Sequence, residues 1–233
     1  MPCLAHERTG NDFDLASLMQ PSRRPLTSRN SHWAAAIAGF LARRRIKPNF
    51  ISVVSVFFAA GAGVCLWFAG HAKESAIPWF LLGAALLMQL RLLCNLFDGM
   101  VAIEGGFKTK SGEIFNELPD RFADALILIG AGYAVSPSQW MPLFGWISAV
   151  LAVLTAYVRA LGASAGASQQ FCGPMAKPHR MAVMTAACLI AAVLGWMKIA
   201  FPLIPIALAL IAVGCVVTVF RRTCRIIREL EQT

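Results

Sequence analysis

The sequence predicts an all-α integral membrane protein with six transmembrane helices, preceded by an interfacial amphipathic helix. Of its 233 residues, 58% are hydrophobic and only 14% are charged, whereas a soluble domain carries about 25% charged residues. The mean hydropathy is +0.63. The apolar residues gather in runs close to the length that crosses a hydrocarbon core of about 30 Å. The basic residues lie mainly between these runs, as membrane topology requires.

Six apolar runs are the candidate transmembrane spans. They are Asn49–Gly70, Ile77–Phe97, Leu118–Ser136, Trp140–Val158, Met181–Met197 and Ile199–Phe220. Lys198 and Pro202 leave little room for a turn between the fifth run and the sixth. The chain is expected to cross the membrane six times.

The distribution of basic residues predicts the orientation. With the N-terminus inside, 18 of the 21 Lys and Arg residues lie on the cytoplasmic side, only Lys73 and Lys198 lie outside, and Arg91 falls within a span. Cytoplasmic segments are enriched in basic residues. Both termini are thus expected in the cytoplasm, at the inner membrane if the source is bacterial. The net charge of +9 then serves topology, and no nucleic-acid partner is expected.

Two segments precede the first span. Residues 1–30 are polar and predict a cytoplasmic tail, and residues 31–233 form the membrane domain. Within Ser31–Arg45, apolar side chains at Trp33, Ile37, Phe40 and Leu41 share one helical face that is followed by three arginines. This pattern predicts a helix lying along an anionic membrane surface. The alternative is a simple basic flank to the first span.

Half of the twelve acidic residues fall in one short stretch of the chain. They are Asp98, Glu104, Glu113, Glu117, Asp120 and Asp124, at the ends of the second and third spans and in the loop between them. Ionisable groups near membrane depth are costly and usually functional. The alternative is ion pairing that only holds the helices together, with Arg91 and Arg121 as available partners.

The spacing of these residues suggests a metal site. Asn95 and Asp98 share one face at the end of the second span, while Asn116, Asp120 and Asp124 repeat every four residues on one face of the third. Two facing helices would then direct oxygen ligands into one wet pocket. Such ligands suit Mg²⁺ or Mn²⁺.

The same stretch resembles the motif of the CDP-alcohol phosphotransferase family, D-x2-D-G-x2-A-R-x8-G-x3-D-x3-D. The chain reads NLFDGMVAIEGGFKTKSGEIFNELPD from Asn95 to Asp120, with every spacing intact. Five positions match the motif: Asp98, Gly99, Ala102, Gly112 and Asp120. Three positions differ, because Asn95 and Asn116 replace aspartates and Ile103 replaces the arginine. The resemblance covers roughly Trp33 to the C-terminus.

This resemblance implies a membrane transferase of phospholipid biosynthesis. It would move a phosphatidyl or related group from a CDP-linked lipid donor to an alcohol acceptor and release CMP, with Mg²⁺ or Mn²⁺, as a homodimer in contact with membrane lipids. By the family pattern Asp98 would ligate metal and Asp120 would ligate metal or act as the catalytic base. Gly99, Ala102 and Gly112 would line the nucleotide pocket, and Lys108 or Lys110 would replace the missing arginine.

The two asparagines weaken the expected metal cage. An amide oxygen can still ligate a hard cation, but it supplies no charge. Three repairs are open: a single metal, substitution by Asp124, Glu117 or Glu113, or binding of the ligand without turnover.

A basic cluster follows the fourth span. Arg159, Lys177, His179 and Arg180 are expected on the cytoplasmic side, where they would bind the substrate and favour a phosphorylated acceptor. The alternative is positive-inside anchoring. Two other functions also stay open: a catalytically silent relative that binds lipid or nucleotide or scaffolds lipid enzymes, and a small transporter.

Overall fold

A computed structural model describes residues 32–106, 112–134 and 139–232. These residues form seven helices and no strand. The helices are α2 (His32–Arg43), α3 (Pro48–Ala69), α4 (Ile77–Glu104), α5 (Gly112–Tyr133), α6 (Met141–Ser164), α7 (Lys177–Trp196) and α8 (Leu203–Glu231). The predicted tail, residues 1–30, lies outside the described residues.

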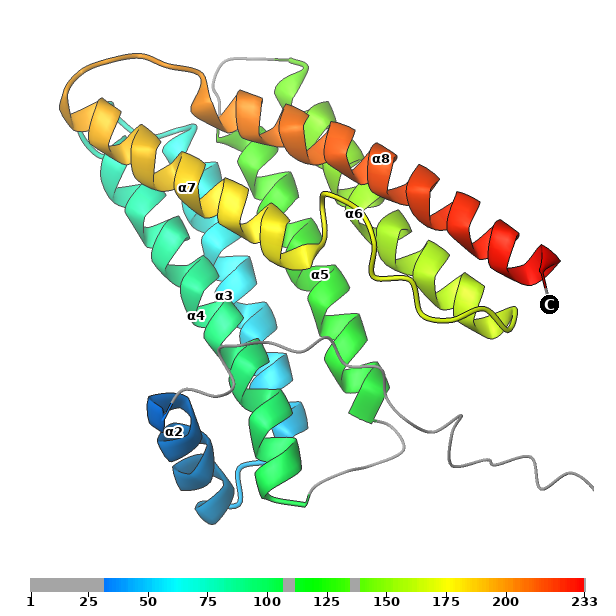
Figure 1. Cartoon of the computed structure of the whole chain (residues 1–233). Coiled ribbons are helices and arrows are strands. Elements are labelled where there is room, and N and C mark those ends of the chain that lie inside the picture. Colours follow the sequence, from blue (N-terminus) through cyan, green and yellow to red (C-terminus); the bar gives the residue numbers. More distant parts are fainter. Residues whose placement is uncertain (1–31, 107–111, 135–138, 233) are drawn as a thin grey trace, which may run out of the picture.

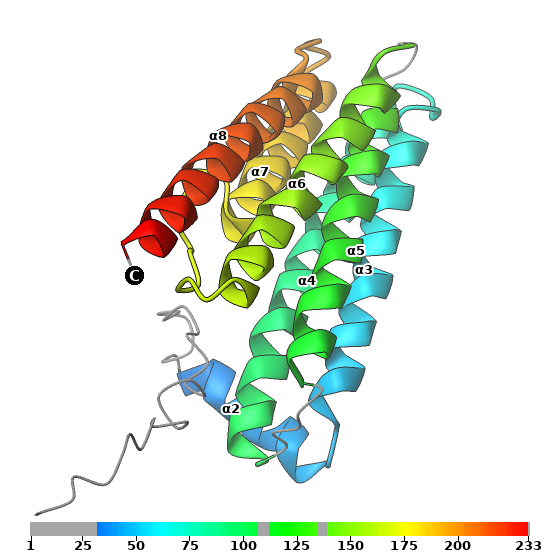
Figure 2. The same cartoon turned by 90° about the vertical axis from the view of Figure 1, so that its right-hand side faces the viewer.

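Six helices pack as a closed ring. Helix α3 contacts α4 and α5, α5 contacts α6, α6 contacts α8, α8 contacts α7, and α7 returns to α4. The long helices α3, α4 and α5 run side by side, whereas α8 crosses the bundle obliquely (Figures 1 and 2). Helix α2 packs on α4 at the end of the bundle where α4 finishes.

Prolines mark the start of four helices. Helices α3, α4, α6 and α7 each carry a proline in their first two positions. The missing N–H of proline costs nothing there, because the first N–H groups of a helix have no intrahelical acceptor. The sequence therefore defines these starts sharply, and α7 begins at Lys177 because Pro178 follows it.

Small residues allow the helices of the ring to approach closely. A Cβ atom added at Gly130 of α5 would lie 2.5 Å from the Gly63 carbonyl oxygen of α3, and one at Gly132 would lie 2.9 Å from the Cα of Gly145 in α6. Close backbone packing at small residues is a common way for membrane helices to associate. Helix α5 is thus clamped between α3 and α6 along its C-terminal half.

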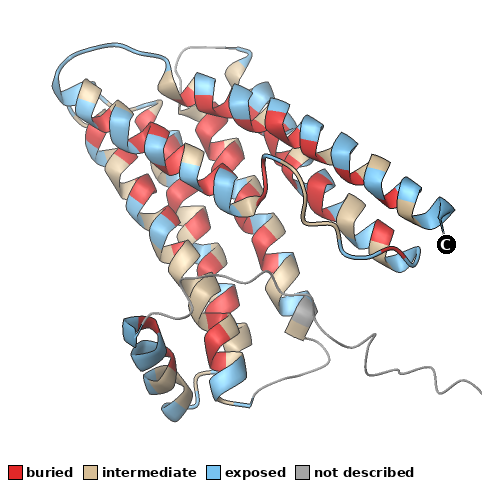
Figure 3. Cartoon of the chain, in the orientation of Figure 1, coloured by how far each residue is buried: buried red, intermediate tan, exposed pale blue. Residues whose placement is uncertain are grey.

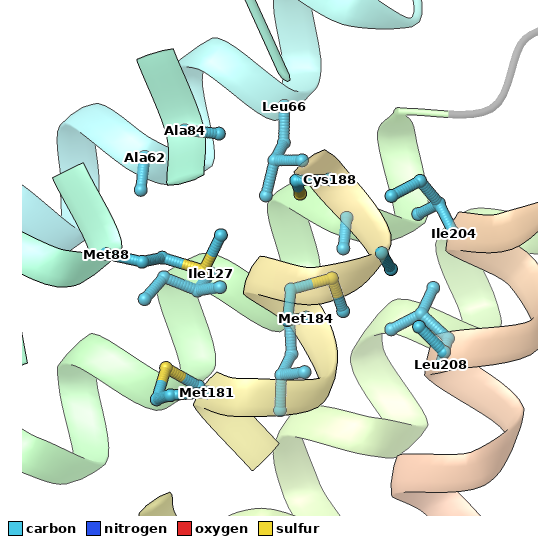
Figure 4. Packing of buried hydrophobic residues seen from close by; sticks show 14 of the residues in the cluster. Ala62, Leu66, Ala84, Met88, Ile127, Met181, Met184, Cys188, Ile204 and Leu208 are labelled. Atoms are coloured by element: carbon cyan, nitrogen blue, oxygen red, sulfur yellow. The ribbon is translucent and has the colours of Figure 1, made fainter. Parts of the chain in front are cut away.

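The core combines these small residues with flexible ones. Met88, Ile127, Met181, Met184 and Leu208 are almost fully buried where α4, α5, α7 and α8 meet (Figure 4). Unbranched methionine fills irregular gaps between helices. Buried residues follow the inward faces of the helices, and exposed residues follow the outward faces (Figure 3).

Five of the described helices are long and apolar enough to cross a membrane: α3, α4, α6, α7 and α8. Large apolar side chains such as Phe57, Val150 and Phe220 point outward, as lipid-facing residues do. The chain is therefore an integral membrane protein. The predicted count of six spans is not confirmed, because the third predicted span corresponds to α5, whose first half carries several charges.

Two helices extend beyond the ends predicted from the sequence. Helix α4 continues to Glu104, beyond the predicted end at Phe97, and α8 continues to Glu231, beyond Phe220. The α4 extension is bounded by Asp98 and Glu104 and the α8 extension is rich in arginine, so an apolar-run criterion omits both. As a result the motif residues of α4 lie on a rigid helix.

The segment before the first span forms the separate helix α2. Its small residues Ala34 and Ala38 are buried, while Trp33, Ile37 and Phe40 are exposed. A helix is therefore present in this segment, and its amphipathic character and position along a membrane surface stay predictions.

Candidate functional site

A cavity of about 990 Å³ opens between α4, α5, α6 and α7. Its polar lining includes the motif residues Asn95, Gly99, Asn116 and Asp120. Five basic side chains also line it, namely Arg121, Arg159, Lys177, Arg180 and Arg222. Leucines of α4 and Ile114, Val153 and Phe171 add an apolar part. A pocket with both characters suits an anionic head group that is attached to a lipid.

Asp120 and Asp124 form the centre of an ion-pair network. The Arg91 guanidinium donates to Oδ1 of Asp124 at 2.8 Å and to Oδ1 of Asp120 at 3.3 Å. The Lys177 ammonium donates to Oδ2 of Asp120. Arg180 donates to Oδ2 of Asp124 at 2.5 Å. The structure thus shows both carboxylates in ion pairs, with Arg91 as one of the partners that the sequence offered.

Helix geometry explains how this network forms. Asp120 and Asp124 lie one turn apart on α5, while Lys177 and Arg180 lie one turn apart at the start of α7. The two pairs therefore meet in register. Arg91 reaches both carboxylates from α4, with its side chain fully buried.

Asp98 has a different environment. Its Oδ2 accepts a hydrogen bond from the Ser52 hydroxyl of α3 at 2.6 Å, and its Oδ1 is buried without a partner in the described part of the chain. Asp98 and Asp124 are 4% and 1% exposed, and neither lines the cavity. The expectation that all five predicted ligands face one wet pocket is wrong for these two residues, because α3, α4 and α7 cover them.

The described side chains do not fit a metal cage in this arrangement. Both oxygens of Asp120 and both of Asp124 already accept from basic groups, and Asn95 directs its amide Nδ2 to Asp120 at 2.9 Å. Among the described residues, no group of three His, Cys, Asp or Glu side chains could hold a metal. Of the three carboxylates, only Asp98 keeps an oxygen without a hydrogen bond. The predicted ligand set of Asn95, Asp98, Asn116, Asp120 and Asp124 stays a prediction.

A second network orders the segment between α6 and α7. Arg222 of α8 donates to the Thr155 carbonyl at 2.5 Å and to the Cys172 carbonyl at 2.9 Å. Arg180 donates to the Met175 carbonyl at 2.9 Å, and the Met175 N–H donates to the Thr218 hydroxyl at 3.1 Å. This segment therefore forms a fixed wall of the cavity.

Gly173 completes the same wall. Its φ is +121°, a conformation that L side chains rarely adopt, and an added Cβ would lie 2.5 Å from the Thr218 side chain. The glycine thus lets the chain turn tightly against α8.

Arg159 has a more exposed environment. It forms an ion pair with Glu117 at 2.6 Å and lies over the Phe171 ring at 5.1 Å from its centroid. Glu117 also pairs with Arg121 at 3.0 Å, one turn along α5. These side chains remain accessible from the cavity, so Arg159 and Arg121 can exchange Glu117 for an anionic ligand.

The remaining predicted residues divide into three groups. Gly99 lines the cavity, and so do Arg159, Lys177 and Arg180. Ala102, Gly112 and His179 do not line it, and His179 is exposed. Lys108 and Lys110 lie outside the described residues.

Arg222 was not among the predicted site residues and counted only as one of the cytoplasmic basic residues. The buried positions Gly214, Thr218, Arg222 and Ile226 of α8 recur every four residues. This spacing places Arg222 on the inward face of the helix. The missed signal was therefore the continuation of the buried stripe into the basic C-terminal segment.

Comparison with solved structures gives the fold. The Mycobacterium tuberculosis phosphatidylinositol phosphate synthase with CDP-DAG bound superposes with a TM-score of 0.70 at 18% identity, over 86% of this chain and 94% of that one. The chain has the fold of this synthase. The same enzyme in complex with manganese and citrate gives a TM-score of 0.69 at 20% identity, over 83% and 88% of the two chains.

Sequence comparison adds little about function. An uncharacterised protein of Aquifex aeolicus is 25% identical over 197 residues, which is 84% of this chain and 89% of that protein. No protein-family model matches the chain. The family resemblance predicted from the motif is thus confirmed at the level of the fold.

Proposed function

We propose that this protein is a membrane transferase of phospholipid synthesis that moves a phosphatidyl or related group from a CDP-linked lipid to an alcohol and releases CMP. One observation carries this proposal: in the fold of an enzyme that binds CDP-DAG, the motif residues Asn95, Gly99, Asn116 and Asp120 line a cavity rich in basic side chains. The mixed polar and apolar lining suits a nucleotide that is joined to a lipid.

The proposal includes the predicted topology. Helix α5 would be the third of six spans, which its place in the ring between α3 and α6 and the pairing of its buried charges support. Helix α2 would lie in the interface with Ile37 and Phe40 toward lipid. Both termini and the cavity face the cytoplasm, and the homodimer stays an expectation from the resemblance.

The basic residues supply the electrostatics of the proposed reaction. The diphosphate of the donor is anionic, and positioned Lys and Arg side chains stabilise charge that develops on a transferring phosphoryl group. Lys177 and Arg180 lie where they can hold the donor, while Arg159 and Arg121 can hold an acceptor, which we expect to be phosphorylated. Asp120 is the candidate base, and it must release one of its hydrogen-bond donors before it takes a proton.

The comparisons support the predicted need for Mg²⁺ or Mn²⁺, but the side-chain contacts of this chain do not. The similar synthase was solved with manganese, whereas the carboxylates of this chain are already ion-paired. When bound in such a site, a divalent metal would neutralise the diphosphate. Ligand binding by the basic residues and proton transfer by Asp120 do not depend on this metal.

A second candidate is a catalytically silent relative that binds a CDP-linked lipid without turnover. The specific observation in its favour is that Asp120 is engaged by Arg91, Asn95 and Lys177. A carboxylate held in this way is a poor base. Both candidates share recognition of the CDP-linked ligand and differ only in the release of CMP.

The decisive experiment is CMP release from CDP-diacylglycerol by purified protein, with glycerol, inositol, serine and their phosphorylated forms as acceptors, with Mn²⁺ and with EDTA. Acceptor-dependent CMP release supports the transferase. Binding of CDP-diacylglycerol without CMP release supports the silent relative, and absence of binding contradicts both.

If the protein is active, its basic residues are expected to set the KM. Lys177→Gln or Arg180→Gln should raise the KM for the phosphorylated substrate about 10-fold or more, since a charge-assisted bond contributes about 1.5–3 kcal/mol. The matched control is Lys73→Gln, an exposed residue between α3 and α4. An unchanged KM in both cavity variants would assign these residues to anchoring.

A further inference from the structure

We propose that the cations of this chain, with Lys177 foremost, replace the divalent metal, so that the cavity binds the diphosphate of a nucleotide-linked lipid without Mg²⁺ or Mn²⁺. This inference rests on the recognition of a CDP-linked ligand proposed above. It adds how the charge of that ligand is balanced, and it holds whether or not turnover follows.

The charges at the centre cancel without a metal. Asp98, Asp120 and Asp124 are the three buried carboxylates among the described residues. The three cations paired with Asp120 and Asp124 are Arg91, Lys177 and Arg180. The formal sum is zero, so a divalent cation placed here would add two uncompensated charges to a buried site, at a large desolvation cost.

The wider cavity carries the charge that a diphosphate needs. Adding Glu117 to the acids gives four negative charges, and adding Arg121, Arg159 and Arg222 to the cations gives six positive ones. The described side chains of the site thus have a formal net charge of +2. A diphosphate linking two esterified groups carries two negative charges. The protein alone therefore balances its ligand.

The motif changes agree with this charge balance. The two asparagines, Asn95 and Asn116, remove two negative charges from the positions where the motif has aspartates. Asn95 uses its amide to donate to Asp120, a role that an ionised aspartate cannot take. Arg91, one turn before Asn95 on α4, donates to the same Asp120 oxygen. Asn95 and Arg91 are therefore parts of one arrangement around Asp120.

Lys177 is placed to serve as the contact cation. It lines the cavity, its side chain is 24% exposed, and it pairs with Asp120. Arg91 is fully buried behind the same carboxylate and does not line the cavity. Arg180 lines the cavity, and its Nε has no hydrogen-bond partner among the described residues. A diphosphate entering the cavity would meet the Lys177 ammonium, because the Arg180 Nε is itself buried.

In the competing arrangement, Lys177 occupies the metal position only in the empty protein. It leaves Asp120 when a metal and its nucleotide bind. Both arrangements contain the same ion pair in the empty protein. They differ in whether the unmodified protein needs a divalent metal to bind its ligand, and that difference can be measured directly.

The test is titration of CDP-diacylglycerol into the purified full chain in detergent, once with EDTA and once with MnCl₂. We expect Kd values that agree within about threefold. Lys177→Met should weaken binding about 10-fold or more in EDTA, and Mn²⁺ should restore part of the loss because Asp120 is then free to ligate. Lys73→Met is the matched control and should behave as the parent, and Lys177→Arg should keep binding in EDTA.

A second measurement uses the metal alone. The electron paramagnetic resonance signal of free Mn²⁺ should be unchanged by the parent protein and should fall with the triple variant Asn95→Asp, Asn116→Asp, Lys177→Met. Uptake of Mn²⁺ by the parent, or ligand binding by the parent only with Mn²⁺, overturns the inference and leaves the proposed function intact. Absence of ligand binding under both conditions overturns both proposals.

Discussion

Two parts of α5 are held in the bundle by different forces. The middle of the helix carries Asp120 and Asp124, which are fixed by ion pairs to α4 and α7. The C-terminal half carries Gly130 and Gly132, which allow backbone contact with α3 and α6. Ion pairs can be exchanged for a ligand, whereas backbone contact cannot. One helix can therefore support the bundle through its glycine contacts and line the site through the ion-paired Asp120.

The largest effect is expected from the buried ion pairs. Asp124→Asn keeps the shape of the side chain but leaves Arg91 and Arg180 facing a neutral amide. Removing one partner of a buried pair costs about 3–5 kcal/mol, because the remaining charge is buried and uncompensated. The free energy of unfolding in mixed detergent micelles measures this loss. A loss below about 1 kcal/mol would show that water or another anion compensates the arginines.

An intermediate effect is expected from the glycine contact. Gly130→Ala places a methyl group 2.5 Å from the Gly63 carbonyl oxygen, which belongs to the backbone and cannot rotate away. Overpacking of this kind costs about 1–3 kcal/mol. The matched control is Gly83→Ala in α4, whose methyl group would lie 3.4 Å from the Cys65 sulfur. Equal stability of the two variants would show that α3 and α5 can separate freely.

The smallest effect is expected from the accessible pair. Glu117 is 44% exposed and pairs with Arg121 and Arg159, so Glu117→Gln should change stability by less than about 1 kcal/mol. Added salt should reduce this difference further. The same amide substitution at Asp124 and at Glu117 thus compares a buried network with an exposed one. An effect at Glu117 as large as that at Asp124 would contradict the assignment of Glu117 to an exchangeable position.

The general fold was accessible from the sequence, since apolar runs and basic flanks report membrane helices directly. The ends of α4 and α8 were not, because Glu104 and Arg222 continue a helix after the apolar signal stops. Helix α5 carries more charge than the five apolar helices, and this charge is paired with basic residues of α4 and α7, which are distant in the sequence.

The site was predictable in its residues and less so in its connections. Spacing placed Asn95, Asn116 and Asp120 together, and all three line the cavity. Spacing did not show that Lys177 pairs with Asp120 or that Ser52 pairs with Asp98. Those contacts depend on how α3 and α7 pack against the motif helices.

The segment between α6 and α7 has a consequence for the thermodynamics of ligand binding. Its backbone is tied to Arg222 and Thr218 of α8, and Ser168 and Gln170 bond to Glu229 near the C-terminus. A wall that is ordered in the empty protein loses little conformational freedom when a ligand arrives. Binding is therefore expected to lack the large entropic penalty and slow ordering phase of a loop that folds around its ligand.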